Sequence, residues 1–278
     1  MNLILADKII NEALVEDIGR GDITSETIIS VDMEAQAAFI SRTAGIVAGL
    51  DIAGRVFKML DPQCRLEKLI SDGARIEVGQ VFARVFGKAR ALLTAERVAL
   101  NFLQHLSGIA TETNNIVETV KSFGVQIADT RKTTPGLRML EKYAVTVGGG
   151  FNHRMGLDDA VLIKDNHLQI TGGVKKAVEL VRKKIGHLIK IEVEVETWEQ
   201  LKEAVQVGVD VIMLDNMDVP TMQEAVKFVN GRALTEASGQ ITAANAKAVA
   251  AAGVDIISLG WITHSARPLD ISLEIEII

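Results

Sequence analysis

With 278 residues, the chain is long enough to bury a large core and to form one large domain or two unequal ones. It carries 30 lysines and arginines against 36 aspartates and glutamates, and the net charge of -6 argues against a general attraction to nucleic acid or to an anionic membrane. Any anion that this protein binds must therefore be held by a local cluster of cations.

Neither the cysteine content nor the amino-terminal segment indicates export from the cell. A single cysteine, Cys64, excludes an intramolecular disulfide framework and fits a reducing compartment. The first apolar stretch is interrupted by Asp7 and Lys8, so it lacks the long apolar core of a signal peptide. No apolar run approaches the roughly 20 residues that a membrane-spanning helix needs. We therefore expect a cytoplasmic protein.

Residues 1–107 predict an α+β domain. Short strands separated by glycines are expected within residues 34–49, 64–70 and 80–87, and a helix is expected over residues 50–60. Residues 88–124 have helical apolar spacing and predict one or two helices, with a break at the Ser107-Gly108 pair.

Residues 108–267 repeat one unit, in which a short Val/Ile/Leu-rich run ends in polar residues and is followed by a helix-like segment. The runs are residues 125–130, 160–166, 189–196, 210–216, 233–239 and 255–260. Helical apolar spacing recurs between them, for example over residues 197–208 and 218–231. Strands that alternate with helices in this way predict parallel pairing.

The run IKIEVEVE favours a barrel over an open sheet. Its glutamates, Glu192, Glu194 and Glu196, alternate along the strand and therefore point to one face. Alternate residues of a barrel strand point inward, and the functional face lies at the strands' carboxyl ends. Six runs are fewer than the usual eight, so we expect an incomplete α/β barrel. An open doubly wound sheet is the alternative, although no G-x-G-x-x-G follows its first strand.

Charged residues recur at the predicted strand ends. Arg131 and Lys132 end the first strand, Lys164 ends the second, and Asp215 ends the fourth. Cations and carboxylates that face each other across a barrel mouth suit a polyanionic substrate with a developing positive centre. Coordination of Mg²⁺ by Glu194 and Asp215, with substrate oxygens completing the shell, fits the same arrangement.

Glycine-containing segments near these ends predict close contact with a ligand. The run 148–150 lacks the G-K-[S/T] ending of a phosphate-binding P-loop, so we expect it to end a helix and to let His153 and Arg154 approach a ligand. The ASG and SLG segments, residues 237–239 and 258–260, end the last two strands, where barrels often bind phosphate. The five histidines show no zinc-site spacing.

Several longer motifs resemble one known family. They are EDIGRGDIT, ERVALNFLQHLSGIAT, DTRKTTPGLR, GGGFNHRMGLDDAVLIKDNH, EVEVE, IMLDN, EASGQI and ISLGWITHSARPLDISLEI. In order and spacing they resemble the quinolinate phosphoribosyltransferases, the decarboxylating nicotinate-nucleotide pyrophosphorylases, over nearly the whole chain. A related molybdenum-transport family shares the fold, but its counterpart of TRKTTPG lacks this pattern.

The resemblance implies a reaction, a fold and an assembly. Quinolinate and phosphoribosyl diphosphate would react with Mg²⁺ to give nicotinate mononucleotide, diphosphate and carbon dioxide, a step of NAD biosynthesis. The fold would be α/β, with an open sandwich domain over residues 1–107, to which residues 268–278 return, and an incomplete, about six-stranded barrel over residues 108–267. The enzyme would be a homodimer or an assembly of dimers, with Arg97 donated across the interface.

The resemblance also assigns individual residues. It implies that the two carboxylates of quinolinate are surrounded by Arg97, Arg131, His153 and Arg154. It implies catalytic roles, near the phosphoribosyl donor and its metal, for Lys132, Lys164, Glu194 and Asp215. The remaining substrate-binding positions, which contact the 5-phosphate or flank the other sites, are Thr130, Ser238, Gly239, Gln240, Leu259, Gly260, Trp261 and His264.

Two other functions fit parts of the pattern. Lys164 at a barrel strand end is also the place for the nucleophile of a Schiff-base aldolase or decarboxylase. The basic residues alone would equally suit a non-catalytic protein that binds a phosphorylated metabolite. Arg131 and Arg154 beside Lys164 fit a dicarboxylate better than a simple aldehyde.

Overall fold

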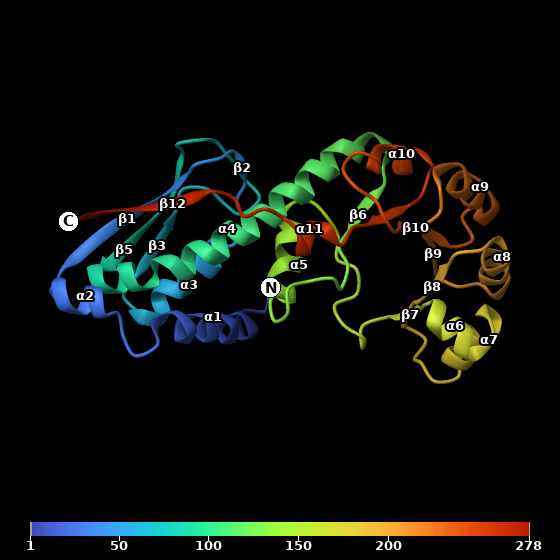
Figure 1. Cartoon of the computed structure of the whole chain (residues 1–278), viewed down its shortest axis with the longest axis horizontal. Helices are drawn as coiled ribbons and strands as arrows, with labels where there is room; N and C mark the ends of the chain where they lie inside the picture. Colours follow the sequence, from blue (N-terminus) through green and yellow to red (C-terminus); the bar gives the residue numbers. More distant parts are fainter. Residues whose placement is uncertain (1, 278) are drawn as a thin grey trace. The chain divides into compact units, whose positions relative to one another are not determined.

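The structure, a computed structural model, describes residues 2–277, and the chain divides into two compact units (Figure 1). The first unit comprises Met1–Asn114, Thr133–Gly149 and Ile262–Ile278, and the second comprises Asn115–Lys132 and Gly150–Trp261. This division differs from the one expected from the sequence, because the first unit extends past residue 107 and includes residues 133–149. Within residues 2–277, no helix has the length and apolarity that crossing a membrane requires.

The first unit is built on a four-stranded antiparallel sheet with the strand order β12-β1-β5-β3. Its strands are β1 (Glu34–Ser41), β3 (Arg65–Lys68), β5 (Val81–Lys88) and β12 (Ile271–Ile277), and β2 (Gly45–Ile46) pairs separately with β4 (Arg75–Ile76). Its other helices, beside α4 and α5 described below, are α1 (Leu3–Ile18), α2 (Ile23–Ile28) and α3 (Leu50–Leu60). In Figure 1 the red carboxyl-terminal strand lies beside the blue β1, with which it pairs.

The core of the first unit follows from the alternation of β1. Every second residue of this strand is buried, as expected for a strand with one face on a core. Phe39 of β1 contacts Phe57 of α3 edge to face, with ring centroids 6.2 Å apart, and lies 6.1 Å from Phe82 of β5. These three fully buried rings join the sheet to the helix that covers it.

Helix α4 (Ala89–Val120) is continuous, so the predicted break at Ser107-Gly108 is wrong. Both residues instead serve close packing. The hydroxyl of Ser107 accepts a hydrogen bond from the backbone N–H of Ala48, 3.0 Å away. A side chain at Gly108 would meet the backbone carbonyl of Arg267, which crosses the helix there. The glycine is therefore a contact point inside a helix and not its end.

Buried polar contacts attach residues 133–149 to the first unit. This segment contains α5 (Arg138–Val147). Its Glu141 is fully buried, and Oε1 of this residue lies 2.9 Å from Nε2 of His105 on α4. The other carboxylate oxygen of Glu141 accepts a hydrogen bond from the N–H of Thr134. Tyr143 donates its hydroxyl proton to Asp72, 2.6 Å away, and burial together with this carboxylate raises the pKa of the phenol.

The second unit is a six-stranded parallel sheet with the order β6-β11-β10-β9-β8-β7. Its strands are β6 (Gln126–Ala128), β7 (Val161–Ile163), β8 (Ile191–Val195), β9 (Val211–Asp215), β10 (Leu234–Ser238) and β11 (Ile256–Ser258). The helices along this part of the chain are η1 (Lys121–Phe123), α6 (Asp165–Thr171), α7 (Val174–Arg182), α8 (Trp198–Val207), α9 (Val219–Val229), α10 (Ala246–Ala251) and α11 (Trp261–His264). The two edge strands, β6 and β7, are not paired with each other in the described part of the chain, which leaves the barrel incomplete as expected.

Local signals place the helices between these strands. Thr197 and Gln200 form a reciprocal capping box at the start of α8, and Gly208 ends that helix in the left-handed conformation. Asp218 caps α9 by accepting a hydrogen bond from the N–H of Thr221. These two helices therefore begin and end where the sequence predicts, and each returns the chain to the amino end of the next parallel strand.

We predict that Gly108→Ala destabilises the protein by about 2 kcal/mol, because the added methyl group must push away the backbone of Arg267 in a tightly packed region. Urea denaturation measures the effect. Gly186→Ala is the control, since nothing lies within 4 Å of a side chain added there, and it should change stability by less than about 0.5 kcal/mol. Equal stability of the two variants would contradict the close packing at Gly108.

Candidate active site

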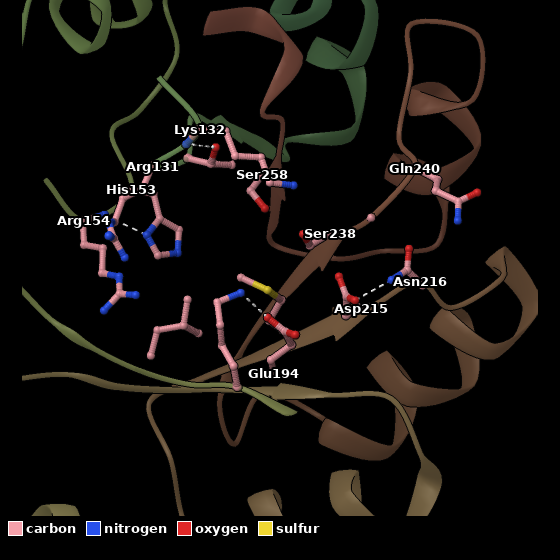
Figure 2. A pocket seen from close by; sticks show the side chains of 15 residues that line it. Arg131, Lys132, His153, Arg154, Glu194, Asp215, Asn216, Ser238, Gln240 and Ser258 are labelled. Carbon is pink, nitrogen blue, oxygen red and sulfur yellow. Dashed lines mark hydrogen bonds and ion pairs between the residues drawn. The ribbon is translucent and has the colours of Figure 1, made fainter. Parts of the chain in front are cut away.

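A cavity of about 590 Å³ opens at the carboxyl ends of the second unit's strands, because parallel strands all end at the same edge of a sheet (Figure 2). The sequence-predicted residues that line it are Thr130, Arg131, Lys132, His153, Arg154, Lys164, Glu194, Asp215, Ser238, Gly239 and Gln240. All of them belong to the second unit. The lining residues come from the ends of both edge strands and of the central strands, so the sheet curves around this cavity.

The cavity wall formed by the described residues does not include five of the predicted positions, namely Arg97, Leu259, Gly260, Trp261 and His264. Arg97 and His264 belong to the first unit, where Arg97 lines a different pocket. Leu259 is buried in the core. Trp261 donates its ring N–H to the backbone carbonyl of Ile241, 3.0 Å away, so it supports the loop that follows β10.

One side of the cavity is basic. In Figure 2, Arg131, His153 and Arg154 lie together, opposite Asp215, Asn216 and Gln240. Partial burial, and then the neighbouring charge of Arg131, lower the pKa of Arg154. The fold thus holds two guanidinium groups near each other at an electrostatic cost, which an anion bound between them would offset.

Hydrogen bonds fix the ring of His153. Its backbone N–H donates to Asp129, 2.9 Å away, and its Nδ1 accepts the N–H of Arg154 at 2.8 Å. Nδ1 therefore carries no proton, and the ring proton resides on Nε2. Nε2 lies 3.0 Å from Oε2 of Glu192 and 3.8 Å from Oε1 of Glu236. The nitrogens thus connect the backbone of Arg154 to two carboxyl groups inside the barrel.

His153, Glu192 and Glu236 also have the composition of a metal site. One ligand atom from each lies within 4.8 Å of the others. A metal at Nε2 would need the lone pair of that nitrogen, whereas the hydrogen bond to Nδ1 leaves the ring proton on Nε2. The hydrogen bonds of this ring therefore do not fit a metal ligand.

Acidic residues occupy the centre and the other side of the cavity. Glu194 is 8% exposed, and its Oε2 lies 2.6 Å from the ammonium of Lys164. Asp215 accepts a hydrogen bond from the side chain of Asn216. Glu192 also points inside, but Glu196 follows the end of β8 and is exposed, so the predicted common face holds for two of the three glutamates.

Backbone strain concentrates where β9 and β10 end. Asn216 and Gln240 have positive φ angles of 53° and 50°, which are uncommon for residues other than glycine. Gly239, which directly precedes Gln240, has a φ angle of 90°. A Cβ atom at this position would lie 2.9 Å from the backbone nitrogen of Asn216. Glycine is needed here because these two loops touch.

Several residues of this region were not predicted from the sequence. Leu162, Met213, Asn216 and Ser258 also line the cavity, and Glu236 lies beneath it. The period of two along a strand could have identified Glu236, which precedes Ser238 by two residues and shares its face. Its acidity inside a barrel, where branched apolar residues are usual, is the further signal.

Family models match the chain in two parts. The quinolinate phosphoribosyltransferase N-terminal domain matches residues 22–107, and the C-terminal domain of the same family matches residues 109–274. Together the two models span most of the sequence and meet within helix α4.

Individual relatives agree with these models. The chain is 45% identical to a probable nicotinate-nucleotide pyrophosphorylase of Bacillus subtilis, with 100% of this chain and 96% of that protein covered. A Synechocystis protein of the same description is 43% identical, with 98% and 93% covered. The solved structure of NadC from Streptococcus pyogenes superposes with a TM-score of 0.97 at 39% identity, covering 100% of this chain and 99% of that one.

We predict that a 1,2-dicarboxylate raises the melting temperature of this protein by a few degrees more than chloride of equal ionic strength, because it relieves the repulsion between Arg131 and Arg154. Differential scanning fluorimetry with phthalate measures the shift. Arg154→Gln should abolish it, whereas Lys202→Gln, which removes an exposed charge on α8, should retain it. An undiminished shift in Arg154→Gln would refute a dicarboxylate site on the basic side.

Proposed function

The chain belongs to the quinolinate phosphoribosyltransferase family, and we propose that it transfers the phosphoribosyl group of phosphoribosyl diphosphate to quinolinate with decarboxylation. The products are nicotinate mononucleotide, diphosphate and carbon dioxide, in the biosynthesis of NAD. The observation that carries this proposal is the lining of one cavity. Arg131 and Arg154 lie on one side of it, and Glu194, paired with Lys164, and Asp215 lie at its centre and other side.

Quinolinate binds on the basic side. Its two adjacent carboxylates match two guanidinium groups, each of which can form a pair of parallel hydrogen bonds. Arg154 is positioned for this by its contact with the carbonyl of Ala160, 3.0 Å away, and by the hydrogen bond from its backbone to His153. The role of His153 is then to hold Arg154 and to line the site, with its Nε2 directed toward Glu192.

The phosphoribosyl donor lies across the centre of the cavity. Lys132 and Lys164 stabilise the departing diphosphate, while Glu194 and Asp215 stabilise the positive charge that develops at the anomeric carbon. The ion pair between Lys164 and Glu194 supports this arrangement, because it holds both charges in the cavity before substrate binds. The pyridine nitrogen attacks the anomeric carbon and the bond to diphosphate breaks, so no covalent enzyme intermediate is needed.

Decarboxylation follows from the charge of the product ring. Once the nitrogen is ribosylated, it is positive, and the carbon–carbon bond to the C2 carboxylate breaks with its electron pair left on C2. Carbon dioxide departs, and C2 takes up a proton. The arginines need only keep the ring in place and water away.

The 5-phosphate binds where β10 and β11 end. Ser238, Gly239 and Gln240 support this assignment because they line the cavity at the end of β10. Thr130, which follows β6, also lines the cavity, and its hydroxyl accepts a hydrogen bond from the N–H of Lys132, 3.0 Å away. The resemblance to the family is what supports the other proposed positions, Leu259, Gly260, Trp261 and His264. Trp261 contributes through the loop that its ring N–H supports.

A magnesium ion is part of the proposal. Glu194 and Asp215 fit it, because Mg²⁺ is commonly held by one or two carboxylates together with substrate phosphates. The ion would supply positive charge to the leaving diphosphate. Since Glu194 already pairs with Lys164, Asp215 is the more accessible ligand of the two.

A homodimer, or an assembly of dimers, completes the proposed enzyme. Arg97 does not line the cavity of the second unit and instead lies in a pocket with Asp22 and Thr94. We propose that Arg97 serves the site of a neighbouring subunit. We also propose a cytoplasmic location, which the single, buried cysteine supports.

The Schiff-base alternative fits the site less well. An amine nucleophile of that kind is unprotonated and lies in apolar surroundings or beside another cation. Lys164 instead pairs with Glu194, and its side chain is 45% exposed. A non-catalytic binding protein would not need the buried carboxylate of Glu194. Loss of turnover in Glu194→Gln would therefore distinguish an enzyme from such a binding protein.

The function is tested directly by incubating the purified protein with quinolinate, phosphoribosyl diphosphate and Mg²⁺. We expect nicotinate mononucleotide and carbon dioxide in equal amounts, and loss of both when EDTA removes the metal. Folded protein that forms neither product would rule out the assignment. Product formation that survives EDTA would rule out the magnesium part alone.

We predict that the two neighbouring cations of the TRKTTPG motif act on different substrates. Arg131→Ala should raise KM for quinolinate by at least about tenfold with little change in KM for the phosphoribosyl donor, because it removes a charged partner of a carboxylate. Lys132→Ala should do the reverse. Steady-state kinetics with each substrate varied in turn measures both, and equal effects of each variant on both substrates would contradict the division.

A further inference from the structure

Two carboxyl groups lie inside the barrel beneath the basic side of the cavity. Glu192 of β8 and Glu236 of β10 are 7% and 2% exposed, at positions where barrels usually pack branched apolar side chains. Oε1 of each is buried and has no hydrogen-bond partner among residues 2–277. A buried carboxylate oxygen without a partner costs free energy, so this pair calls for a physical explanation.

A second cavity reaches the same groups from the other end of the barrel. It has a volume of about 230 Å³ and is lined by Val161, Val211 and Ile256, which begin their strands, and by Glu192 and Glu236. His153 and Arg154 line both cavities and therefore form the wall between them. Glu236 can thus exchange a proton with solvent through this second cavity while substrate occupies the first.

The charges around Glu236 favour its neutral form. Burial and then the charge of Glu192 raise the pKa of Glu236 to about 7, although His153, Ser258 and Lys164 act in the opposite direction. At the mouth of the second cavity the charged groups are Arg154, Asp159 and Lys190.

We propose that Glu236 is a positioning residue for quinolinate: its neutral form limits the buried pair of Glu192 and Glu236 to one negative charge beneath the two arginines. One ligand atom of each carboxyl group lies within 4.8 Å of a ligand atom of the other and of His153, so two negative charges there would repel each other strongly. Glu192 then holds the ring of His153, and His153 holds the backbone of Arg154. This inference rests on the proposed function, because it concerns how the same site binds quinolinate.

Under this proposal, the affinity of the protein for quinolinate depends on pH. The neutral form of Glu236 predominates below its pKa of about 7 and is lost as the pH rises through that value. A second buried negative charge then lies near the arginines that bind quinolinate, whose carboxylates are ionised over the whole range. The affinity for quinolinate should therefore fall as the pH increases.

The decisive variant is Glu236→Gln, which is close in shape and cannot ionise. Isothermal titration of quinolinate, without the donor, should show about tenfold weaker binding to the natural protein at pH 8.5 than at pH 6.5. Glu236→Gln should match the natural protein at pH 6.5, bind equally well at pH 8.5, and so exceed it there. KM for the phosphoribosyl donor should change little.

Glu196→Gln is the matched control, because Glu196 lies on the same segment as Glu192 but is exposed beyond the end of β8. It should keep the pH dependence of the natural protein. Parallel pH profiles of the natural protein and Glu236→Gln would overturn the proposal. If the natural protein makes nicotinate mononucleotide at pH 6.5 while those profiles coincide, the enzymatic function stands and only this inference fails.

A measurement on the natural protein keeps the proposal testable if Glu236→Gln does not fold. A carboxylic acid and a carboxylate absorb at different infrared frequencies. Infrared difference spectra between pH 6.5 and 8.5 should show a buried carboxylic acid that disappears as the pH rises and persists to higher pH when quinolinate is bound. Absence of the carboxylic acid band at pH 6.5 would overturn the proposal.

Discussion

Parallel pairing of six strands is the constraint on which the rest of this site depends. It brings the carboxyl ends of all the strands to one edge, so short polar segments that are far apart in the sequence meet around one cavity. The helices between the strands return the chain to the amino end of the sheet each time, and among residues 2–277 no helix contributes a residue to the cavity wall. The chemistry of the site is thus separated from the part of the fold that stabilises it.

The barrel interior carries charge, and this charge is arranged in pairs. Lys164 pairs with Glu194 at the centre of the cavity, and the ring of His153 lies between Arg154 and the two buried carboxyl groups. On the basic side of the cavity, partial burial and then the charge of Arg131 lower the pKa of Arg154, whereas Glu192 and Asp159 raise it. An anion bound between the two arginines would offset the electrostatic cost of holding them near each other.

Contacts between distant chain segments explain what local sequence reasoning could not predict. Gly108 was expected to break a helix, but the segment at Arg267 presses against that helix and leaves no room for a side chain. Trp261 lies outside the cavity wall that the described residues form, and its ring N–H donates to the carbonyl of Ile241; its contact with the substrate stays a prediction. In each case the residue has a partner more than 19 positions away, which no local pattern reports.

By itself, the sequence determined the parallel sheet, the strand ends that carry charge and the family, because hydrophobic period, capping residues and long motifs are local properties of the chain. Only the tertiary structure decided that Glu192 and Glu236 meet His153 and that Glu196 stays outside. It also decided that residues 133–149 join the first unit. These outcomes depend on which strands are neighbours and on how far the sheet curves, and both are set by packing between residues distant in the sequence.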